Sequence, residues 1–261
     1  LYCWLIKKSF GFCASGKLSA YAMKQSRWKK ILVLLVFQKI MSKASFIHYA
    51  TKQEREEQVV NFFKEIRPII LPPSVQIPEK IIENNQLKYY SVSRINPIKN
   101  IEYIFNNFPN CNYPFTLYGE YLENDPYIKK LLEIKKLRDK NQVNEMLKFG
   151  NYINKNKLDM EYGLGSIFII CSNSEGLSNA ALEALSRGSV VIASQGCRMK
   201  DYLKSGALIE ISCDDGNNLK KIINSISLEL AKEMGRKGRE FMQLTHSKLA
   251  LSERCKAEFF I

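Results

Sequence analysis

The sequence predicts an α/β fold in which helices cover both faces of a parallel sheet. Short apolar segments after residue 70 alternate with helical stretches, and this alternation is typical of strands buried in a parallel sheet. The five predicted strands are KYYSVS, FTLY, SIFIIC, SVVIAS and ALIEIS. A proline-rich stretch, IRPIILPPSVQIPEK, precedes them and is typical of a linker. We therefore expect one complete doubly wound domain over residues 71–261 and a separate unit over residues 1–70.

The unit before the linker is too short to form a doubly wound domain of its own. Its sequence contains one amphipathic helical run and one predicted strand, SFIHYA. We expect residues 1–70 to be the C-terminal remnant of a second domain, with apolar surface left uncovered. His48 lies in the predicted strand and His246 in the last helical stretch, and both histidines are interpreted as structural.

Positive charge is concentrated in the first part of the chain. The sequence has 39 Lys and Arg against 26 Asp and Glu, a net charge of +13. Residues 1–53 hold ten basic residues and no acidic one, which leaves +3 (13 − 10) for the rest. We expect an anionic partner for this segment. The apolar run 31–37 is too short to span a bilayer but could lie on an anionic membrane surface; alternatively, it packs into a second domain.

Several other function classes find little support. The seven cysteines are scattered, with no Cys-x-x-Cys pair, which argues against a disulfide framework or a zinc site and for a reduced, cytoplasmic chain. Cys171 ends a predicted buried strand and is interpreted as a small hydrophobe. Gly163-Leu164-Gly165 precedes a strand instead of following one, so it is read as a turn and not as a dinucleotide fingerprint. Apart from net charge and interleaved aromatic residues, nothing suggests nucleic-acid binding.

The most informative segment is SNSEGLSNAALEALSRG, which follows the predicted strand SIFIIC. Ser178 is a good N-cap and Gly188 is placed to end the helix, so Glu175 lies in the loop and Glu183 in the second turn. Unpaired amides at a helix N-terminus bind phosphate, and a nearby carboxylate accepts hydrogen bonds from hydroxyls. This combination suggests a nucleotide sugar. The alternative is a solvent-facing Glu183 and a Glu175 that complements the helix dipole.

A second segment carries two cations five residues apart. Residues 89–93 are predicted as a strand, and Arg94-Ile95-Asn96-Pro97-Ile98-Lys99 follows at once, before a helical stretch. Cations at the carboxyl end of a parallel strand suit a pyrophosphate. The alternative is a solvated loop.

Five segments occur in an order that is known from one family. The order is SRINPIKN, FTLYGE, FGNYI, SIFIICSNSEGLSNAALEALSRG and VVIAS. It resembles the donor-binding half of retaining glycosyltransferases of family 4, which have the GT-B fold. Upstream, SGKLSAYAMKQSRWKK is similar to the stretch that follows the acceptor loop in many bacterial members. The resemblance implies a complete Rossmann-like donor domain over 71–261 and a partial N-terminal acceptor domain over 1–70.

The resemblance also implies roles for individual residues. Arg94 and Lys99 would hold the donor pyrophosphate, Glu175 would bind the sugar hydroxyls, and Glu183 would bind the ribose. The first three are the expected catalytic residues. The remaining donor contacts would come from the base-binding region and from backbone amides of the loop before the helix, namely Tyr152, Ile153, Gly176, Leu177 and Ser178.

No metal or other cofactor is expected. A cation pair can stabilise the charge that develops on the leaving nucleoside diphosphate, and the chain has no Asp-x-Asp motif. Asp214-Asp215 is interpreted as a loop and helix cap before Asn217. Some positions depart from the family pattern without removing a charged donor contact. They are Ser93, Asn100, Cys171 and Ser189, and also Ser15, which replaces an arginine common in the acceptor loop.

The function that the resemblance implies is transfer of a sugar from a UDP- or GDP-linked donor to a cell-surface polysaccharide or lipid-linked oligosaccharide, with retention of configuration. The chain would act in the cytoplasm, with peripheral attachment to the inner membrane through residues 1–53 as a further expectation. An alternative stays open: a truncated module that binds nucleotide sugar without turning it over, because transfer needs an acceptor held within reach.

Overall fold

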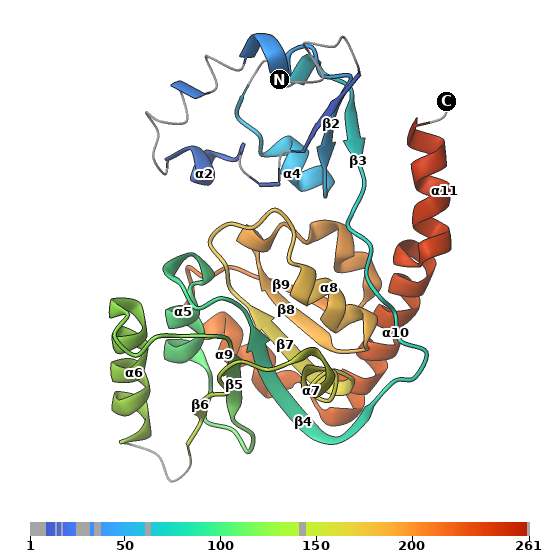
Figure 1. The fold of residues 1–261 in the computed structure, drawn as a ribbon. Coiled ribbons are helices and arrows are strands. Elements are labelled where there is room, and N and C mark those ends of the chain that lie inside the picture. Colours follow the sequence, from blue (N-terminus) through green and yellow to red (C-terminus); the bar gives the residue numbers. More distant parts are fainter. Residues whose placement is uncertain are drawn as a thin grey trace.

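The computed structural model describes residues 9–13, 15–16, 18–24, 32–33, 38–60, 64–140 and 145–259. Two parallel sheets occupy separate parts of the chain (Figure 1). A sheet of three strands lies in the N-terminal part, and a sheet of six strands lies after residue 82. The expected domain boundary at residue 70 stays a prediction.

The larger sheet has the strand order β6-β5-β4-β7-β8-β9, and every pair is parallel. This confirms the α/β class. The five predicted strands are all present. Their bounds are β4 Glu83–Val92, β5 Phe115–Tyr118, β7 Leu164–Ile170, β8 Val190–Ser194 and β9 Leu208–Ile211, and the strand β6, Leu147–Phe149, was not expected. The turn predicted at Gly163-Leu164-Gly165 is wrong for its last two residues, because β7 begins at Leu164.

Helices cover both faces of this sheet, as predicted. Ile167 and Ile169 of β7 contribute to a core shared with α5, α6 and α9, whereas Phe168 and Ile170 contribute to a core shared with α8. Seven consecutive buried residues in β7 explain why this strand reads as one apolar run. The helices are α5 Ile101–Asn107, α6 Pro126–Asp139, α7 Lys155–Leu158, α8 Asn179–Ser186, α9 Gly216–Ser225, α10 Leu228–His246 and α11 Lys248–Phe259.

The N-terminal part contains more strand than the sequence indicated. The expected strand SFIHYA is β2, Phe46–Tyr49. It pairs with β1, Gly11–Cys13, and with β3, Pro68–Ile70, so the prediction of a single strand here is wrong. β3 begins inside the predicted linker, where Pro68 is tolerated because it is the first residue of its strand. Short helices accompany this sheet, and those with both ends described include α2 Ala20–Lys24 and α4 Lys52–Glu56.

The basic segment is only partly covered by the structure. Most of the apolar run 31–37 lies outside the described residues, and of it Leu32 and Val33 are exposed. Among the helices that the structure describes, none is both long enough and apolar enough to cross a bilayer.

The C-terminal helix returns to the N-terminal sheet (Figure 1). In α11, Arg254 donates a hydrogen bond of 3.3 Å to the carbonyl of Ile70, and the ring of Phe259 meets Phe46 edge to face at 5.1 Å. Arg67 donates to the carbonyl of Glu258 at 2.6 Å. The chain therefore connects the two sheets twice, through residues 71–82 and through α11.

Candidate functional site

The site lies at the carboxyl edge of the larger sheet, where β4 and β7 are neighbours. Strands before β7 in the chain lie on one side of this pair and strands after it on the other, so the pair is the topological switch point of the sheet. The loops that follow both strands leave from the same edge. The amide of Asn173 donates to the carbonyl of Ile98 at 2.8 Å, which ties the two loops together.

Lys99 and Glu175 form an ion pair between these loops. The two residues are 76 positions apart in the chain, and their side chains are 16% and 17% exposed. Ser172 donates a second hydrogen bond of 2.9 Å to the same Glu175 carboxylate oxygen. The structure thus brings together one predicted residue from each of the two motifs.

The helix after the loop has the predicted caps. Ser178 is the N-cap of α8 and accepts a hydrogen bond of 3.3 Å from the amide of Ala181. Gly188 has a φ of +85°, which suits a residue that follows a helix end. The backbone of residues 176–178 therefore leads from Glu175 into α8, and the assignment of its amides to the donor stays a prediction.

Glu183 lies in the second turn of α8 and is half-buried. The hydroxyl of Tyr162 lies 3.5 Å from its carboxylate. Burial raises the pKa of Tyr162 strongly, and the Glu183 carboxylate raises it further. The guanidinium of Arg187 lies 5.0 Å from the centre of the Tyr162 ring. Glu183 is therefore partly covered and contacts the Tyr162 hydroxyl. It is not the solvent-facing residue of the alternative interpretation.

At the same edge of the sheet, β4 is followed by Arg94 and β6 by Tyr152 and Ile153. Among the described residues, none of these three side chains forms a hydrogen bond or ion pair with Glu175. Arg94 is exposed, and no hydrogen bond or ion pair is present for its side chain among the described residues. Tyr152 is 68% exposed. It follows Asn151, which has a φ of +55° and whose carbonyl accepts a hydrogen bond from Gly119. Their assignment to phosphate and base stays a prediction.

A short turn after β8 supports the Glu175 loop from behind. The turn is the 3-10 helix η3, Gln195–Cys197. The amide of Glu175 donates to the carbonyl of Gly196 at 2.9 Å, and the hydroxyl of Ser194 donates to the carbonyl of Ser172 at 2.7 Å. A Cβ at Gly196 would lie 2.3 Å from that Ser172 oxygen. This turn was not predicted, although Gly196, two residues after the predicted strand SVVIAS, was a signal for it.

Two buried charged residues were also missed. Arg198 follows the turn, is 3% exposed, and donates to the carbonyl of Glu175. Glu54 is 4% exposed and accepts hydrogen bonds from the amides of Gly16 and Ala50. Neither residue belongs to a motif, so only their three-dimensional neighbours identify them.

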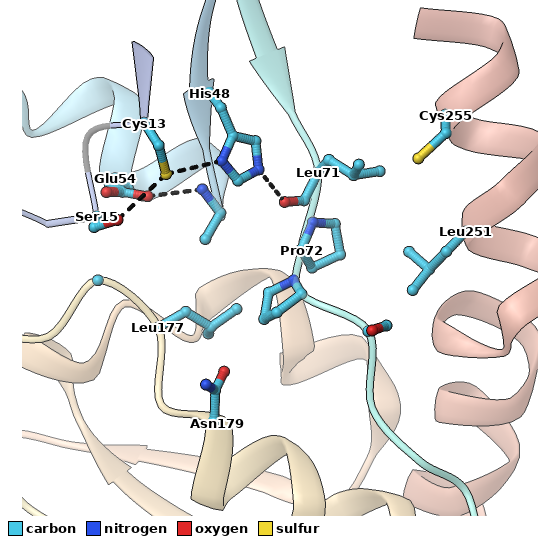
Figure 2. Close-up of a pocket in the computed structure, with 14 residues that line it drawn as sticks. Cys13, Ser15, His48, Glu54, Leu71, Pro72, Leu177, Asn179, Leu251 and Cys255 are labelled. Carbon is cyan, nitrogen blue, oxygen red and sulfur yellow. Dashed lines mark hydrogen bonds between the residues drawn. The ribbon is translucent and has the colours of Figure 1, made fainter. Parts of the chain in front are cut away.

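A cavity of about 610 Å³ lies between the two parts of the chain (Figure 2). Its walls come from the N-terminal sheet, the linker, the start of α8 and α11. His48 Nε2 lies 2.6 Å from the carbonyl of Leu71, so Nδ1 is the nitrogen that faces the Cys13 sulfur at 3.1 Å. Next to the cavity, a Cβ at Gly16 would lie 2.8 Å from the amide nitrogen of Gly176, so the loop that contains Ser15 touches the Glu175 loop.

Four further predictions concern a helix cap, a cysteine, a histidine and the absence of a metal site. Asp215 caps α9 by accepting from Asn217 at 2.9 Å, as predicted. Cys171 is 1% exposed, which confirms its reading as a small hydrophobe. His246 is buried against the hydroxyl of Tyr202 at 2.9 Å, and burial lowers its pKa to about 4. In the part of the chain that the structure describes, three or more His, Cys, Asp or Glu side chains do not gather in a group suited to a metal ion.

Comparison with known proteins gives a family match and a set of structural matches. The family described as glycosyl transferases group 1 matches residues 75–241, the segment that contains both motifs and the larger sheet. No curated protein sequence matches the chain significantly.

The structural matches extend over nearly the whole chain. Sucrose-phosphate synthase from Thermosynechococcus elongatus superposes with a TM-score of 0.80 at 16% identity, covering 98% of this chain and 69% of that chain. HepE from Anabaena, in complex with UDP and glucose, superposes with a TM-score of 0.78 at 14% identity, covering 99% of this chain and 73% of that chain. A UDP-forming trehalose-phosphate synthase from Burkholderia xenovorans gives 0.75 at 11% identity, with 98% and 69% covered.

Proposed function

Because the chain belongs to the group 1 glycosyl transferases, we propose that it transfers a sugar from a nucleotide-sugar donor and that the donor lies at the β4/β7 edge. The observation that carries this proposal is the contact between Lys99 and Glu175 across the switch point. Lys99 supplies a cation for phosphate and Glu175 a carboxylate for hydroxyls, and the two side chains are close enough to contact one ligand.

Each chemical group of the donor would be bound by a different set of residues. Arg94 and Lys99 take the pyrophosphate, and the amides of residues 176–178 add hydrogen bonds to it at the start of α8. Glu175 takes the sugar hydroxyls and Glu183 the ribose. Tyr152 and Ile153 face the base. In this arrangement Lys99 exchanges a carboxylate partner for a phosphate oxygen when the donor binds.

Of the two nucleotides considered, UDP is the one we propose as part of the donor. HepE has been crystallised with UDP-glucose, and a trehalose-6-phosphate protein from E. coli has been crystallised with UDP-2-fluoro glucose. These structures share the fold of this chain at 12% identity each. They support UDP as the first nucleotide to test, with GDP as the alternative.

The reaction is proposed to retain configuration and to proceed without a metal or other cofactor. The developing negative charge on the leaving diphosphate would be stabilised by Arg94 and Lys99, which carry fixed positive charge where that charge appears. This is the behaviour of family 4, to which the five ordered motifs point.

The acceptor is proposed to be a cell-surface polysaccharide or lipid-linked oligosaccharide in a bacterial cell, handled in the cytoplasm at the inner membrane. The basic character of residues 1–53 supports an anionic surface as partner, because each exposed cation near such a surface adds to binding. Replacement of the usual arginine by Ser15 leaves the acceptor itself undefined.

Calorimetric titration of the 261-residue chain with UDP, GDP and their glucose conjugates tests the donor assignment. We expect micromolar binding of one nucleotide that persists in EDTA. A parallel assay measures slow hydrolysis of the bound donor. Binding with hydrolysis supports the transferase, binding without any turnover supports a nucleotide-sugar-binding module, and absence of binding by every nucleotide contradicts the assignment of the site.

A further inference from the structure

We propose that Arg198 is a positioning residue that couples the N-terminal part of the chain to the carboxylate that faces the sugar. The proposal rests on the proposed function and identifies a residue that sets the position of Glu175 in the donor site. Its basis is a set of hydrogen bonds that converge on one buried guanidinium from two different parts of the chain.

The guanidinium of Arg198 bridges Glu57 and Glu175. One terminal nitrogen donates to the backbone carbonyl of Glu175, and Nε donates to the Glu57 carboxylate at 2.6 Å. The Arg198 side chain is 3% exposed and that of Glu57 is 40% exposed. Glu57 and Arg198 are 141 positions apart, so this bridge forms only when the N-terminal part lies against the donor domain.

The contact is well suited to arginine. A planar guanidinium can donate to a carbonyl and a carboxylate at the same time with fixed geometry, which a lysine ammonium on a flexible stem cannot reproduce. Arg198 also has a φ of +53°, a left-handed conformation that is unfavourable for a residue with a Cβ. The buried hydrogen bonds offset this local cost, so the side chain is fixed in one orientation.

Three polar contacts join α4 and its C-cap Glu57 to the segment 195–201. The amide of Lys52 donates to Asp201 at 3.1 Å, Gln53 lies 3.5 Å from the carbonyl of Gln195, and Arg198 binds Glu57. Gln53 also donates to Glu57 at 2.6 Å, which orients the carboxylate toward Arg198. Of these three contacts, the one through Arg198 reaches the Glu175 loop directly.

The bridge has a specific consequence for donor binding. Glu175 is held at its amide by Gly196 and at its carbonyl by Arg198, so both ends of its peptide backbone are fixed. Loosening Arg198 lets the backbone of Glu175 rotate and moves its carboxylate relative to the sugar. Arg94 follows a different strand, and Lys99 becomes freer for a phosphate when its carboxylate partner moves, so affinity for UDP alone should not fall.

The test compares affinities for UDP and UDP-glucose in the wild-type chain, Glu57→Ala and Arg198→Lys. We expect the affinity ratio of UDP-glucose to UDP to fall by roughly threefold or more in both variants, a coupling of the size seen within one hydrogen-bond network, while UDP affinity itself does not fall. In a Glu175→Gln background, Glu57→Ala should then cause no further change in the ratio, because its effect passes through Glu175.

Glu83→Ala is the matched control. Glu83 is 49% exposed and pairs with Lys232 at 2.8 Å, but it lies at the start of β4, away from the donor edge. It should leave the ratio unchanged. An unchanged ratio in Glu57→Ala, or an equal further loss in the Glu175→Gln background, overturns the coupling. If the wild-type chain binds neither nucleotide, the donor site itself is wrong, which is a separate outcome.

Discussion

Replacing Glu175 by glutamine should strengthen the binding of free UDP while weakening the contribution of the sugar. In the structure Glu175 holds Lys99, the cation that is proposed to bind the pyrophosphate. Glutamine keeps the size and the hydrogen-bonding oxygen but removes the charge. Lys99 then becomes more available to a phosphate, and the sugar hydroxyls lose a charged acceptor.

The expected size of the effect follows from the burial of the pair. Both side chains are less than one-fifth exposed, at 16% and 17%, so salt screens the interaction only partly. Hydrogen bonds to a charged group contribute about 1.5–3 kcal/mol, and a neutral acceptor provides roughly half of that. The variant should therefore release about 1 kcal/mol to UDP binding, roughly a fivefold gain in affinity. The affinity ratio of UDP-glucose to UDP should fall by about tenfold.

Calorimetry at constant ionic strength measures both quantities in one preparation. Glu183→Gln is the matched control, since it makes the same chemical change on α8 at the proposed ribose contact. It should weaken UDP and UDP-glucose by the same factor. If Glu175→Gln leaves UDP affinity unchanged or lowers it, the exchange of Lys99 between carboxylate and phosphate is refuted.

Three further results are expected. Arg94→Ala should weaken UDP and UDP-glucose equally, because both carry the pyrophosphate; calorimetry would disprove this by showing a loss for one of them only. Gly196→Ala should lower the affinity ratio of UDP-glucose to UDP, since its Cβ would lie 2.3 Å from the carbonyl of Ser172 and 2.6 Å from that of Asn173; a wild-type ratio would contradict the supporting role of the turn. His246 has a folded-state pKa of about 4, below the usual 6.5, because of burial and then the charge of Arg254. The unfolded chain therefore binds the proton more readily, and the free energy of unfolding should fall by roughly 3 kcal/mol as pH drops from 6.5 to 4. Urea denaturation across that range measures it, and a His246→Gln chain should lose this part of the pH dependence.

The donor domain was predictable because its signals are local. Each predicted strand is an apolar run, and the caps of α8 depend on Ser178 and Gly188, which lie next to the helix in the sequence. Parallel sheets place their strand ends at one edge, so two motifs that follow strands could be expected to meet. The ion pair between Lys99 and Glu175 agrees with that expectation.

The remaining features depend on contacts between distant residues. The three-residue strands β1, β3 and β6 are too short to show a period and exist because a neighbouring strand pairs with them. Arg198 looks like an ordinary surface arginine in the sequence. Its burial results from Glu57 and from the carbonyl of Glu175, which no local pattern connects to it.

The order of strands in the larger sheet also constrains how the chain acquires its structure during synthesis. The strands β4, β5 and β6 are adjacent in the sheet and consecutive in the chain, so they can pair as soon as residue 149 has emerged. The other edge of β4 stays open until β7 arrives, after residues 150–163 have been added. An open strand edge is a site for pairing with other chains. The ten-residue strand β4 therefore presents an open edge to other chains until β7 covers it.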